Sequence, residues 1–512
     1  MFCDKPHVNT LTSLLLAHGL HDAVVCPGSR NAVIIHNLHE ADFNLYPVTD
    51  ERSAAFIAIG LWLAIRRPII VCVTSGSALL NLLPGVAEAA FRRIPLFIIS
   101  ADRSAQWIGQ LDGQTLPQHG ALQSYASAWT LPELTPSDTA EHHWYCNRVA
   151  NEALSTLSKQ EGPVHLNVPI SEPLFSFSVP QLPVERIIHT YHPLALCDIP
   201  EHLQQIILQA KAPLLVIGQY EDTPLQDLQK LKSLGWKVFA ENISNHAEFS
   251  DGLPTTSHDV IVHIGGAFVN KDIKLLLRRQ EPVIIRIDDT NEMPDTFCHL
   301  AYKLRIPVPT AVNWLSHLCT AGTPQVAVSP SNHSLATLFH SQKCSFVALF
   351  LGNSTAVRWA ERHISRHRLA EHTYCNRGTN GIEGCLSVAA GYSLATKHLV
   401  LCILGDLSFF YDANALWNVR LCANLRIMLL NNGHGGIFSK LPGLAQSPAL
   451  TDYIAASHPF TAKGIAASFD CTYLSQTSSD LTADFDCFLE KLMKVSSKRP
   501  VVMEIIVEDE NY

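Results

Sequence analysis

The stretch Leu399-Val400-Leu401-Cys402-Ile403-Leu404-Gly405-Asp406-Leu407-Ser408 is followed closely by Ile427-Met428-Leu429-Leu430-Asn431-Asn432. Each apolar run predicts a buried strand that ends at an oxygen-bearing side chain, Asp406 in the first and Asn432 in the second. Parallel strands end at the same edge of a sheet, so the two side chains could bind a hard cation and a phosphate. An ordinary doubly wound sheet would look the same if these residues only formed turns, which favour Asp and Asn.

Composition favours a multidomain protein that acts on small molecules. The chain has 512 residues, more than one hydrophobic core usually supports, so we expect about two to four domains. Lys and Arg total 37 against 46 Asp and Glu, a formal charge of −9, and no basic run suits a nucleic acid backbone. We therefore expect no nucleic acid partner.

Cysteine usage and hydropathy predict a cytoplasmic protein. The 14 cysteines include no Cys-x-x-Cys pair, and Cys72 and Cys402 lie in apolar runs, where a free thiol behaves as a small hydrophobic group. The longest apolar stretch, Ala54–Ile65, is too short to span a bilayer, and the residues after Met1 lack the pattern of a secretory signal. We expect a soluble chain with no integral membrane segment.

Short apolar runs alternate with helix-length segments along the whole chain, as in parallel sheets that helices cover on both faces. We predict strands at Ala23–Cys26, Ile69–Val73, Leu96–Ile99, Val164–Val168, Leu214–Ile217, Val260–Ile264, Val283–Ile287, Phe346–Leu351, Leu399–Leu404, Ile427–Leu430 and Val501–Val507. Pro169–Pro193 and Ala321–Ser334 are rich in Pro and Ser and predict linkers. The sequence thus predicts an α/β fold of three doubly wound parallel-sheet domains, at residues 1–180, 190–325 and 335–512.

The first and third of these domains repeat one pattern. Glu51 opens a predicted helix in the first, and Glu383 opens one in the third. The strand that follows ends at Ser75-Gly76 in the first and at Gly405-Asp406 in the third, and the next strand starts 20 residues after Gly76 and after Asp406. Matched spacing suggests a duplicated sheet domain, although any two doubly wound domains share some of this rhythm.

The turn at Gly405-Asp406, followed by Asn431-Asn432, resembles the diphosphate and metal signature of thiamine diphosphate enzymes. Enzymes of this family contain two related α/β domains, one for the aminopyrimidine ring and one for the diphosphate, often with a third domain between them. The resemblance implies the thiamine diphosphate-binding fold. It also implies thiamine diphosphate as the cofactor, which supplies a carbanion at C2 of its thiazolium ring.

Glu51 matches the glutamate that this family places against the aminopyrimidine. It lies in Val48-Thr49-Asp50-Glu51-Arg52-Ser53, after a short strand and at the start of an apolar helix. By the resemblance, its carboxylate favours the imino tautomer, so that the cofactor's own amino nitrogen removes the C2 proton. A glutamate that only complements its helix dipole would stand at the same place. The presence of Asp406 and Asn432 in the same chain favours the catalytic role.

The resemblance implies that the divalent metal ion is bound by oxygen ligands. The Asp406 carboxylate, the Asn432 side chain and the main-chain carbonyl of His434 would bind Mg²⁺ or Mn²⁺ together with the diphosphate. A transition-metal site is not expected, because no His-Glu-x-x-His motif or paired His and Cys ligands lie nearby. The resemblance also places these residues at the cofactor: Ser75, Gly76, Ile382, Gly405, Leu407, Ser408, Gly435, Gly436 and Ile437. For Ile382, ordinary core packing is the other explanation.

Within the thiamine diphosphate enzymes, the chain is most similar to the synthases of 2-succinyl-5-enolpyruvyl-6-hydroxy-3-cyclohexene-1-carboxylate (SEPHCHC) in menaquinone biosynthesis. The resemblance covers nearly the whole chain. The matching segments are Cys26-Pro27-Gly28-Ser29-Arg30, Asp50-Glu51-Arg52, Thr74-Ser75-Gly76-Ser77, Ala101-Asp102-Arg103, Gly352-Asn353-Ser354, Asn376-Arg377-Gly378, Gly405-Asp406-Leu407-Ser408 and Asn431–Phe438. The Gly-Asp-Leu and Pro-Gly-Ser-Arg turns are specific to this branch.

The reaction of that family explains the arginines in these turns. 2-Oxoglutarate loses CO₂ on the cofactor and the remaining four-carbon unit adds to isochorismate, so the site must bind several carboxylates, for which guanidinium groups are suited. The resemblance places Ser29, Arg30, Arg103 and Gln114 at isochorismate, Ser354, Arg358 and Arg377 at the oxoglutarate-derived acid, and Phe438 beside both. In the middle domain it aligns Lys271 with one of two basic residues. A surface charge or structural ion pair is the other explanation for any one arginine.

The resemblance further implies a homodimer, or a dimer of dimers, with active sites shared between chains. Two departures affect the substrates: Asn31-Ala32-Val33 follows Arg30 where many relatives have a proline before the helix, and the chain is short for the family. An acetolactate synthase relative acting on pyruvate is a second possibility, against which the arginines argue. A binding protein that kept only the fold is a third, but it should have lost Glu51, Asp406 or Asn432.

Overall fold

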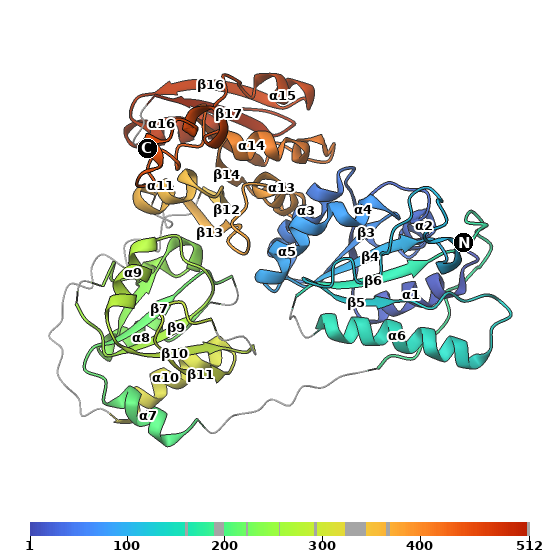
Figure 1. Ribbon diagram of the computed structural model, residues 1–512, viewed down its shortest axis with the longest axis horizontal. Helices are drawn as coiled ribbons and strands as arrows, with labels where there is room; N and C mark the ends of the chain where they lie inside the picture. Colours follow the sequence, from blue (N-terminus) through green and yellow to red (C-terminus); the bar gives the residue numbers. More distant parts are fainter. Residues whose placement is uncertain are drawn as a thin grey trace. The chain divides into compact units, whose positions relative to one another are not determined.

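The computed structural model contains three β-sheets, each flanked by helices (Figure 1). It describes residues 1–158, 162–188, 199–221, 224–254, 256–290, 294–322, 345–364 and 369–508. The pairings between the named strands in these ranges are parallel. The predicted α/β class with three parallel sheets is therefore confirmed.

The N-terminal sheet has the strand order β2-β1-β3-β4-β6-β5. Its strands are β1 (Asp22–Val25), β2 (Asn44–Pro47), β3 (Ile69–Val73), β4 (Leu96–Asp102), β5 (Ser127–Thr130) and β6 (Val164–Pro169). Its helices are α1 (Pro6–Ala17), α2 (Ala32–Glu40), α3 (Glu51–Ile65), α4 (Ser77–Asn81), α5 (Leu83–Phe91) and α6 (Ala140–Ser158), with the turn η1 (Ala105–Trp107). One hydrophobic core joins α1, α2 and α6 to the strands, whereas α3 and α5 lie on the opposite face (Figure 1).

The middle sheet has the order β11-β10-β9-β7-β8, which is 2-1-3-4-5 when counted from its first strand, an order common in doubly wound sheets. Its strands are β7 (Pro213–Ile217), β8 (Lys237–Ala240), β9 (Val260–Ile264), β10 (Val283–Asp288) and β11 (Leu300–Arg305). Its helices are α7 (Glu201–Leu208), α8 (Leu228–Ser233), α9 (Lys271–Arg279) and α10 (Val308–Gly322), with the turns η2 (Asn242–Ser244) and η3 (Ala247–Phe249). Two separate cores, one of them built on α9, cover its two faces.

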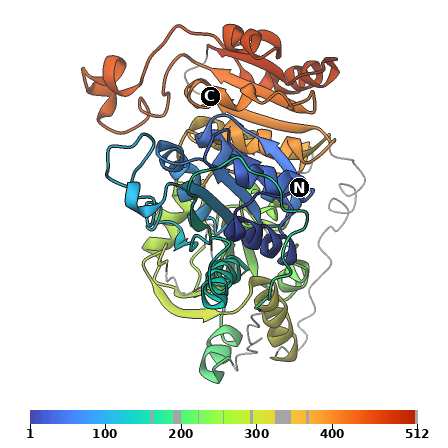
Figure 2. The same ribbon diagram turned by 90° about the vertical axis from the view of Figure 1, so that its right-hand side faces the viewer.

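The C-terminal sheet has the order β13-β12-β14-β15-β17-β16. Its strands are β12 (Phe346–Leu351), β13 (Ala370–Cys375), β14 (Val400–Gly405), β15 (Leu425–Asn431), β16 (Thr472–Ser478) and β17 (Val501–Val507). Its helices are α11 (Thr355–His363), α13 (Cys385–Leu394), α14 (Asp406–Tyr411), α15 (Lys463–Ser468) and α16 (Leu481–Lys494). The stretch between β15 and α15 contains the turns η6 (Leu444–Gln446) and η7 (Leu450–Ile454) and loops away from the strands (Figure 2).

The chain divides into two compact units. The first comprises Met1–His192, Gly352–Thr355 and Gly378–Tyr512, and the second comprises Pro193–Leu351 and Ala356–Arg377. Both the start of the N-terminal sheet and the Asp406 turn therefore belong to the first unit. The three predicted domain ranges remain a prediction, because the boundaries at 190, 325 and 335 lie outside the described residues.

Within the first unit, α3 packs on α13 through one glycine of each helix. A Cβ atom at Gly60 would lie 2.0 Å from the Val388 carbonyl oxygen, and one at Gly391 would lie 2.1 Å from the Ile57 carbonyl oxygen. No L side chain fits at such distances, so the two helices approach to backbone contact. The helix predicted to open at Glu383 starts at Cys385 instead, because Gly384, with φ +73°, turns the chain there.

The predicted strands all coincide with observed ones, with small shifts at their ends. Each of them is an interior strand of its sheet. The predicted ranges gave no bounds for β2, β5, β8, β11, β13 and β16, which are all edge strands; of these, only β2 was expected, as the short strand before Glu51.

The first predicted linker is bound to the N-terminal sheet domain over the part that is described. Ser178 N donates to Asp4 Oδ1 over 2.8 Å, and Ile188 N donates to Asn151 Oδ1 over 2.9 Å. Residues 189–193 of this linker, and 323–334 of the second, lie outside the described residues. In the described ranges, no helix combines the length and the hydropathy that a membrane span requires.

Candidate functional site

The predicted site residues follow the carboxyl ends of parallel strands, where open α/β sheets bind ligands. They form three groups. The first, at the N-terminal sheet, is Ser29, Arg30, Glu51, Ser75, Gly76, Arg103 and Gln114. The second, at the C-terminal sheet, is Ser354, Ile382, Gly405, Asp406, Leu407, Ser408, Asn432, His434, Gly435, Gly436, Ile437 and Phe438. The third, in the second unit, is Lys271, Arg358 and Arg377.

Glu51 is the first residue of α3 and is half-buried. Asp50 caps this helix by accepting a hydrogen bond from Arg52 N over 2.9 Å, which leaves the Glu51 carboxylate free of the capping role. The Asn81 side chain donates to Glu51 Oε2 over 3.2 Å. A separate residue therefore caps the helix, and Glu51 is the acid of its first turn.

The turn after β3 is held by Gln118, which sequence reasoning missed. Its Oε1 accepts a hydrogen bond from Gly76 N over 2.7 Å. Its Nε2 donates to Ala101 O over 3.1 Å and to Asn167 Oδ1 over 2.8 Å. The buried amide of Gln118 therefore joins the ends of β3, β4 and β6 in one network.

The same network continues to Asp102 and Arg103. Asn167 Nδ2 donates to Asp102 Oδ2 over 2.9 Å, and Arg103 N donates to Asp102 Oδ1 over 2.8 Å. Burial raises the pKa of Asp102, while the hydrogen bond from Asn167 works in the opposite direction. The structure thus fixes the backbone at Arg103 relative to the turn at Gly76.

Arg103 and Gln114 lie together beside this turn. Arg103 Nε donates to Gly113 O over 3.2 Å, and its Nη1 lies 3.5 Å from Asp112 Oδ2. The neighbouring Gln114 has φ +58°, and its Cα would lie 3.1 Å from a Cβ atom at Gly76. Two predicted isochorismate residues and one predicted cofactor residue therefore meet at one end of the sheet.

Arg30 lies deeper than the prediction implies. Its Nη1 donates to Ile170 O over 2.9 Å, and its Nη2 lies 3.0 Å from Glu172 Oε1, with the side chain 8% exposed. Ser29, next to it, is exposed. Asn31, which follows Arg30, closes the turn with a 2.8 Å hydrogen bond from its Nδ2 to Cys26 O. In this structure Arg30 is part of an internal ion pair.

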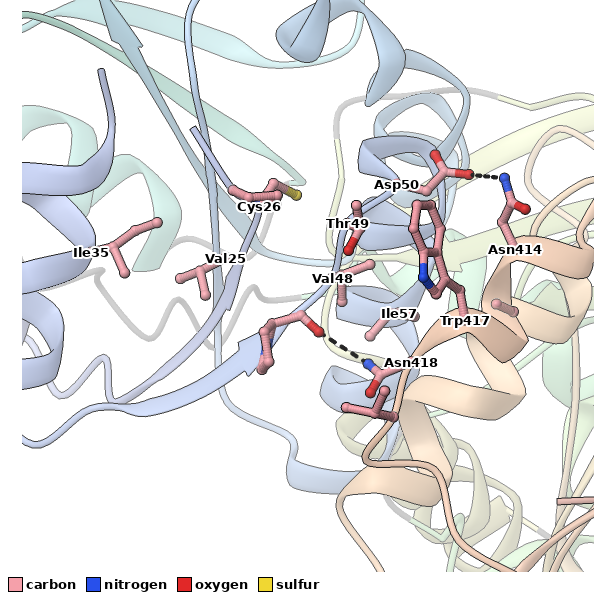
Figure 3. A pocket seen from close by; sticks show the side chains of 14 residues that line it. Val25, Cys26, Ile35, Val48, Thr49, Asp50, Ile57, Asn414, Trp417 and Asn418 are labelled. Carbon is pink, nitrogen blue, oxygen red and sulfur yellow. Dashed lines mark hydrogen bonds between the residues drawn. The ribbon is translucent and has the colours of Figure 1, made fainter. Parts of the chain in front are cut away.

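A pocket of about 300 Å³ lies beside the first group (Figure 3). Cys26, Val48 and Asp50 line it on one side, and the turn η5 (Ala413–Trp417) lines it on the other. Asn414 Nδ2 donates to Asp50 Oδ2 over 2.8 Å across it (Figure 3). None of the predicted site residues lines this pocket, and among the described residues no hydrogen bond or ion pair joins Glu51 to the second group.

Asp406 is the centre of the second group. It begins α14, its residue is 3% exposed, and its two oxygens accept backbone N–H groups: Oδ1 from Leu407 over 2.6 Å and Oδ2 from Gly433 over 2.7 Å. Burial raises the pKa of Asp406, and these two hydrogen bonds oppose that change. The bond to Gly433 brings the turn after β14 against the loop after β15.

Asn431 and Glu504 fix that loop, although only Asn432 was predicted to act there. Asn431 Nδ2 donates to Glu504 Oε1 over 2.7 Å, and Asn431 Oδ1 accepts from Gly433 N over 2.9 Å. Glu504 is fully buried on β17. The first asparagine of the pair is therefore a support, and the side chain of Asn432 is half-exposed next to it.

The glycines after Asn432 form a cradle with no room for side chains. Gly433 has φ +74°, and a Cβ atom at Gly436 would lie 2.8 Å from Asn432 Nδ2. The carbonyl of His434 accepts from Gly436 N over 2.9 Å and keeps a second lone pair. A carboxylate, an amide and a carbonyl oxygen around a glycine loop suit a diphosphate with Mg²⁺ or Mn²⁺, so the residues fit this cofactor.

Ile382 lies at the edge of the second group. Its side chain is 37% exposed, which excludes ordinary core packing as its role. Its carbonyl accepts the Ser408 hydroxyl, and Asn353 Nδ2 donates to Gly381 O over 2.7 Å just before it. Ser354, with φ +70°, follows Asn353 directly. The structure therefore brings Ser354, Ile382 and Ser408 together.

In the second unit, Arg377 lies near two other cations. Its Nη2 donates to Phe268 O over 2.9 Å. Burial first, and the charge of Arg377 second, lower the pKa of both Arg358 and Lys274. Lys274, which sequence reasoning missed, lies one turn of α9 beyond the exposed Lys271. Three converging positive charges suit an acid with more than one carboxylate.

The loop before α9 is fixed by a buried acid. Glu241 accepts hydrogen bonds from Val269 N over 2.6 Å and from Asn270 N over 2.7 Å. Burial, and then the charge of Glu361, raise the pKa of Glu241 to about 7. No local motif marks Glu241, because its partners lie 28 and 29 residues away.

Comparison with known proteins agrees with this arrangement. The model described as "Thiamine pyrophosphate enzyme, N-terminal TPP binding domain" matches residues 8–127, and the one described as "Thiamine pyrophosphate enzyme, C-terminal TPP binding domain" matches residues 352–505. Relatives named 2-succinyl-5-enolpyruvyl-6-hydroxy-3-cyclohexene-1-carboxylate synthase include those of Phocaeicola vulgatus and Bacteroides fragilis. The first is 39% identical over 94% of this chain and 92% of the relative, and the second is 38% identical over 99% and 96%.

Solved structures show the same fold. Benzoylformate decarboxylase from Polynucleobacter necessarius superposes with a TM-score of 0.69 over 99% of each chain at 17% identity. A thiamine diphosphate-dependent 4-hydroxybenzoylformate decarboxylase from Rhodococcus jostii superposes with a TM-score of 0.70 over 98% of this chain and 99% of that one at 19% identity. At these identities the likeness concerns the fold alone.

Proposed function

We propose that this chain, which belongs to the thiamine pyrophosphate-dependent SEPHCHC synthase family, decarboxylates 2-oxoglutarate and adds the remaining four-carbon unit to isochorismate. The products are SEPHCHC and CO₂, in menaquinone biosynthesis. The observation that carries the proposal is the 2.7 Å hydrogen bond from Gly433 N to Asp406 Oδ2, which holds the Asp406 carboxylate against the glycine loop after β15. This chain is also 38% and 39% identical to synthases named for this product.

The chain contains both thiamine pyrophosphate-binding domains. We infer that Asp406, Asn432 and the His434 carbonyl bind Mg²⁺ or Mn²⁺ with the diphosphate, because hard cations prefer these oxygen ligands. Other residues proposed to contact the cofactor are Ser75, Gly76, Ile382, Gly405, Leu407, Ser408, Gly435, Gly436 and Ile437. When bound, thiamine diphosphate would supply the electron sink that decarboxylation of a 2-oxo acid requires.

The proposed catalytic residue of the protein is Glu51. Its carboxylate exchanges a proton with the aminopyrimidine nitrogen and thereby sets the tautomer of that ring. Its half-buried position and its hydrogen bond from Asn81 support this role, because the group is held in place and remains accessible. Asp50 provides the cap of α3, so capping is not the task of Glu51.

The substrates are proposed to be bound by two sets of cations. Arg103, beside Gln114 and Gly76, would face the carboxylates of isochorismate, with Ser29 and Arg30 as further candidates. Arg358 and Arg377 would bind the acid derived from 2-oxoglutarate, with Ser354, Lys271 and Phe438 as further contacts. The lowered pKa of Arg358 supports this, because its second cause, after burial, is the charge of Arg377, and two neighbouring positive charges attract a dicarboxylate.

We further propose a homodimer or a dimer of dimers, in which Glu51 of one chain meets Asp406 of another. A two-fold axis pairs the two half-sites reciprocally, and no bond among the described residues joins them within a chain. Mixing inactive Glu51→Gln chains with inactive Asp406→Ala chains should then restore activity, because each hybrid dimer contains one intact site. Hybrids that form by native mass spectrometry but stay inactive would place the whole site in one chain.

The activity test is incubation with 2-oxoglutarate, isochorismate, thiamine diphosphate and Mg²⁺, with loss of isochorismate followed by its absorbance. Consumption that requires both acids and the cofactor supports the proposal. Pyruvate self-condensation without loss of isochorismate would instead indicate an acetolactate synthase type of enzyme. We expect the enzyme to work in the cytoplasm, where the described cysteines would stay as the free thiols seen here.

A further inference from the structure

His458 lies against the proposed metal clamp, although no motif points to it. Its Nε2 is 3.5 Å from Asp406 Oδ2, and the two side chains are 9% and 4% exposed. Its backbone N donates to Gly433 O over 2.8 Å. Gly433 N in turn donates to the same Asp406 oxygen over 2.7 Å. Three segments far apart in the sequence therefore close a ring around one carboxylate oxygen.

In the neutral ring of His458, hydrogen bonding determines which nitrogen carries the proton. Phe460 N donates to His458 Nδ1 over 3.2 Å, so Nδ1 acts as an acceptor. The proton of a neutral imidazole then sits on Nε2. This buried Nε2–H has no hydrogen-bond partner within hydrogen-bonding geometry among the described residues, and it lies close to Asp406. A buried donor without a partner is costly, which indicates a task for this group.

The ring of His458 is held on two sides. Phe410 of α14 contacts it edge-on, with the ring centroids 5.2 Å apart, and Phe460 stacks on it at 5.9 Å. Such packing limits the ring's rotation and keeps Nε2 directed at the clamp. Simple filling of a core would need the ring but not a donor at Nε2.

We propose that His458 is a positioning residue, which holds the Asp406 carboxylate in the orientation that binds the divalent ion. This inference rests on the proposed function, because it assumes that Asp406 is a ligand. Ligating carboxylates are commonly hydrogen-bonded by a surrounding group, and loss of that group weakens metal affinity about 10- to 100-fold. The Nε2–H of His458, 3.5 Å from Asp406 Oδ2, is the donor placed to make this hydrogen bond, and it comes from the loop that also contains the glycine cradle.

The test compares two variants, each of which replaces one of the two ring nitrogens of His458. His458→Gln places an amide N–H near the position of Nε2, and His458→Asn keeps an acceptor near Nδ1 but cannot reach Asp406. Calorimetric titration of thiamine diphosphate at fixed Mg²⁺, and of Mg²⁺ at fixed cofactor, gives the affinities. We expect His458→Asn to weaken Mg²⁺-dependent binding about 10- to 100-fold and His458→Gln to stay within about threefold of wild type.

Controls separate this inference from the proposed function. His143→Asn, on the exposed face of α6, should bind as wild type does. Unchanged binding by Asp406→Ala would overturn the clamp itself, whereas lost binding there with unchanged binding in His458→Asn would overturn only the role of His458. If His458→Asn does not fold, His458→Met replaces it. Failure of both to fold, or equal losses in the Gln and Asn variants, would make His458 a packing residue and overturn the proposal.

Discussion

The N-terminal and C-terminal sheets have the same strand order but different chemistry at their carboxyl ends. Counted from its own first strand, each runs 2-1-3-4-6-5. At the turn after the third strand, the N-terminal sheet presents Gly76, whose N–H is bound by the neutral amide of Gln118. The matching turn of the C-terminal sheet presents Asp406, which accepts two backbone N–H groups.

The strand ends next to these turns differ in the same sense. After β4 the N-terminal sheet has Arg103, a cation that contacts Gly113 and Asp112. After β15 the C-terminal sheet has Asn432 and a glycine cradle. Two sheets of the same strand order therefore present a cation at one end and a set of oxygen atoms at the other. The turn residues decide the chemistry, and strand order decides only where they stand.

The largest expected effect separates catalysis from binding on the N-terminal side. Glu51→Gln should bind thiamine diphosphate but lower turnover about 10²- to 10⁴-fold, because an amide cannot exchange the proton. Steady-state rates and calorimetric affinity check both halves of this statement. Glu141→Gln, an exposed first-turn acid of α6, is the control for a mere helix-dipole effect. Near wild-type turnover in Glu51→Gln would remove Glu51 from the mechanism.

On the C-terminal side, Asp406→Ala should lose cofactor binding, whereas Glu51→Gln should lose turnover. Asp406→Ala removes the only charged member of the proposed ligand set, so Mg²⁺-dependent cofactor affinity should fall by more than about 100-fold, beyond the loss expected for a supporting group. Calorimetry with and without Mg²⁺ measures this. Asp452→Ala, exposed on η7, should bind normally. Equal affinities in all three proteins would place the ion elsewhere.

A smaller effect is expected in the second unit, where the comparison concerns substrate charge. Arg358→Ala and Arg377→Ala should each weaken kcat/KM for 2-oxoglutarate by about 10- to 150-fold, since a charge-assisted hydrogen bond contributes about 1.5–3 kcal/mol. For a 2-oxo acid without the distal carboxylate, kcat/KM should fall much less. Arg362→Ala, exposed on the same helix as Arg358, is the matched control. Equal losses for both donors would make the arginines structural.

Burial explains how far the fold could be predicted from the sequence. Interior strands such as β3 are buried along their whole length, so they are continuous apolar runs that the sequence reveals. Edge strands such as β11 and β16 have one neighbour and remain partly exposed, and their mixed residues do not stand out from a loop. Apart from the short strand expected before Glu51, the sequence therefore predicted each sheet without its edges.

The candidate site divides in the same way. Glu51, Asp406 and Asn432 lie in short motifs at strand ends, where local sequence is enough to predict them as site residues. Gln118 and Glu504 were missed because each is a single polar residue whose partner lies far away, 42 residues for Gln118 with Gly76 and 73 for Glu504 with Asn431. Only the folded structure brings such partners together.

The smallest expected effect is the pH dependence of stability, which distinguishes a buried acid near the C-terminal sheet from a buried histidine of the N-terminal sheet. In the C-terminal half, burial raises the pKa of Asp412 to about 6, although the backbone and hydroxyl of Ser387 donate to it over 2.7 Å. In the N-terminal half, burial lowers the pKa of His165 to about 4. Asp412 therefore destabilises the fold as pH rises through 4 to 6, whereas His165 destabilises it as pH falls through 6.5 to 4.

Asp412→Asn tests the first of these slopes. An unfolded pKa near 3.8 and a folded pKa of about 6 predict that wild type loses about 2 kcal/mol relative to the variant between pH 4.5 and 7. The difference between their thermal midpoints, measured by calorimetry on apo-protein at several pH values, should grow with pH in favour of Asn. Asp486→Asn, exposed on α16, should run parallel to wild type. Parallel curves for Asp412→Asn as well would mean that the buried carboxyl does not titrate in this range.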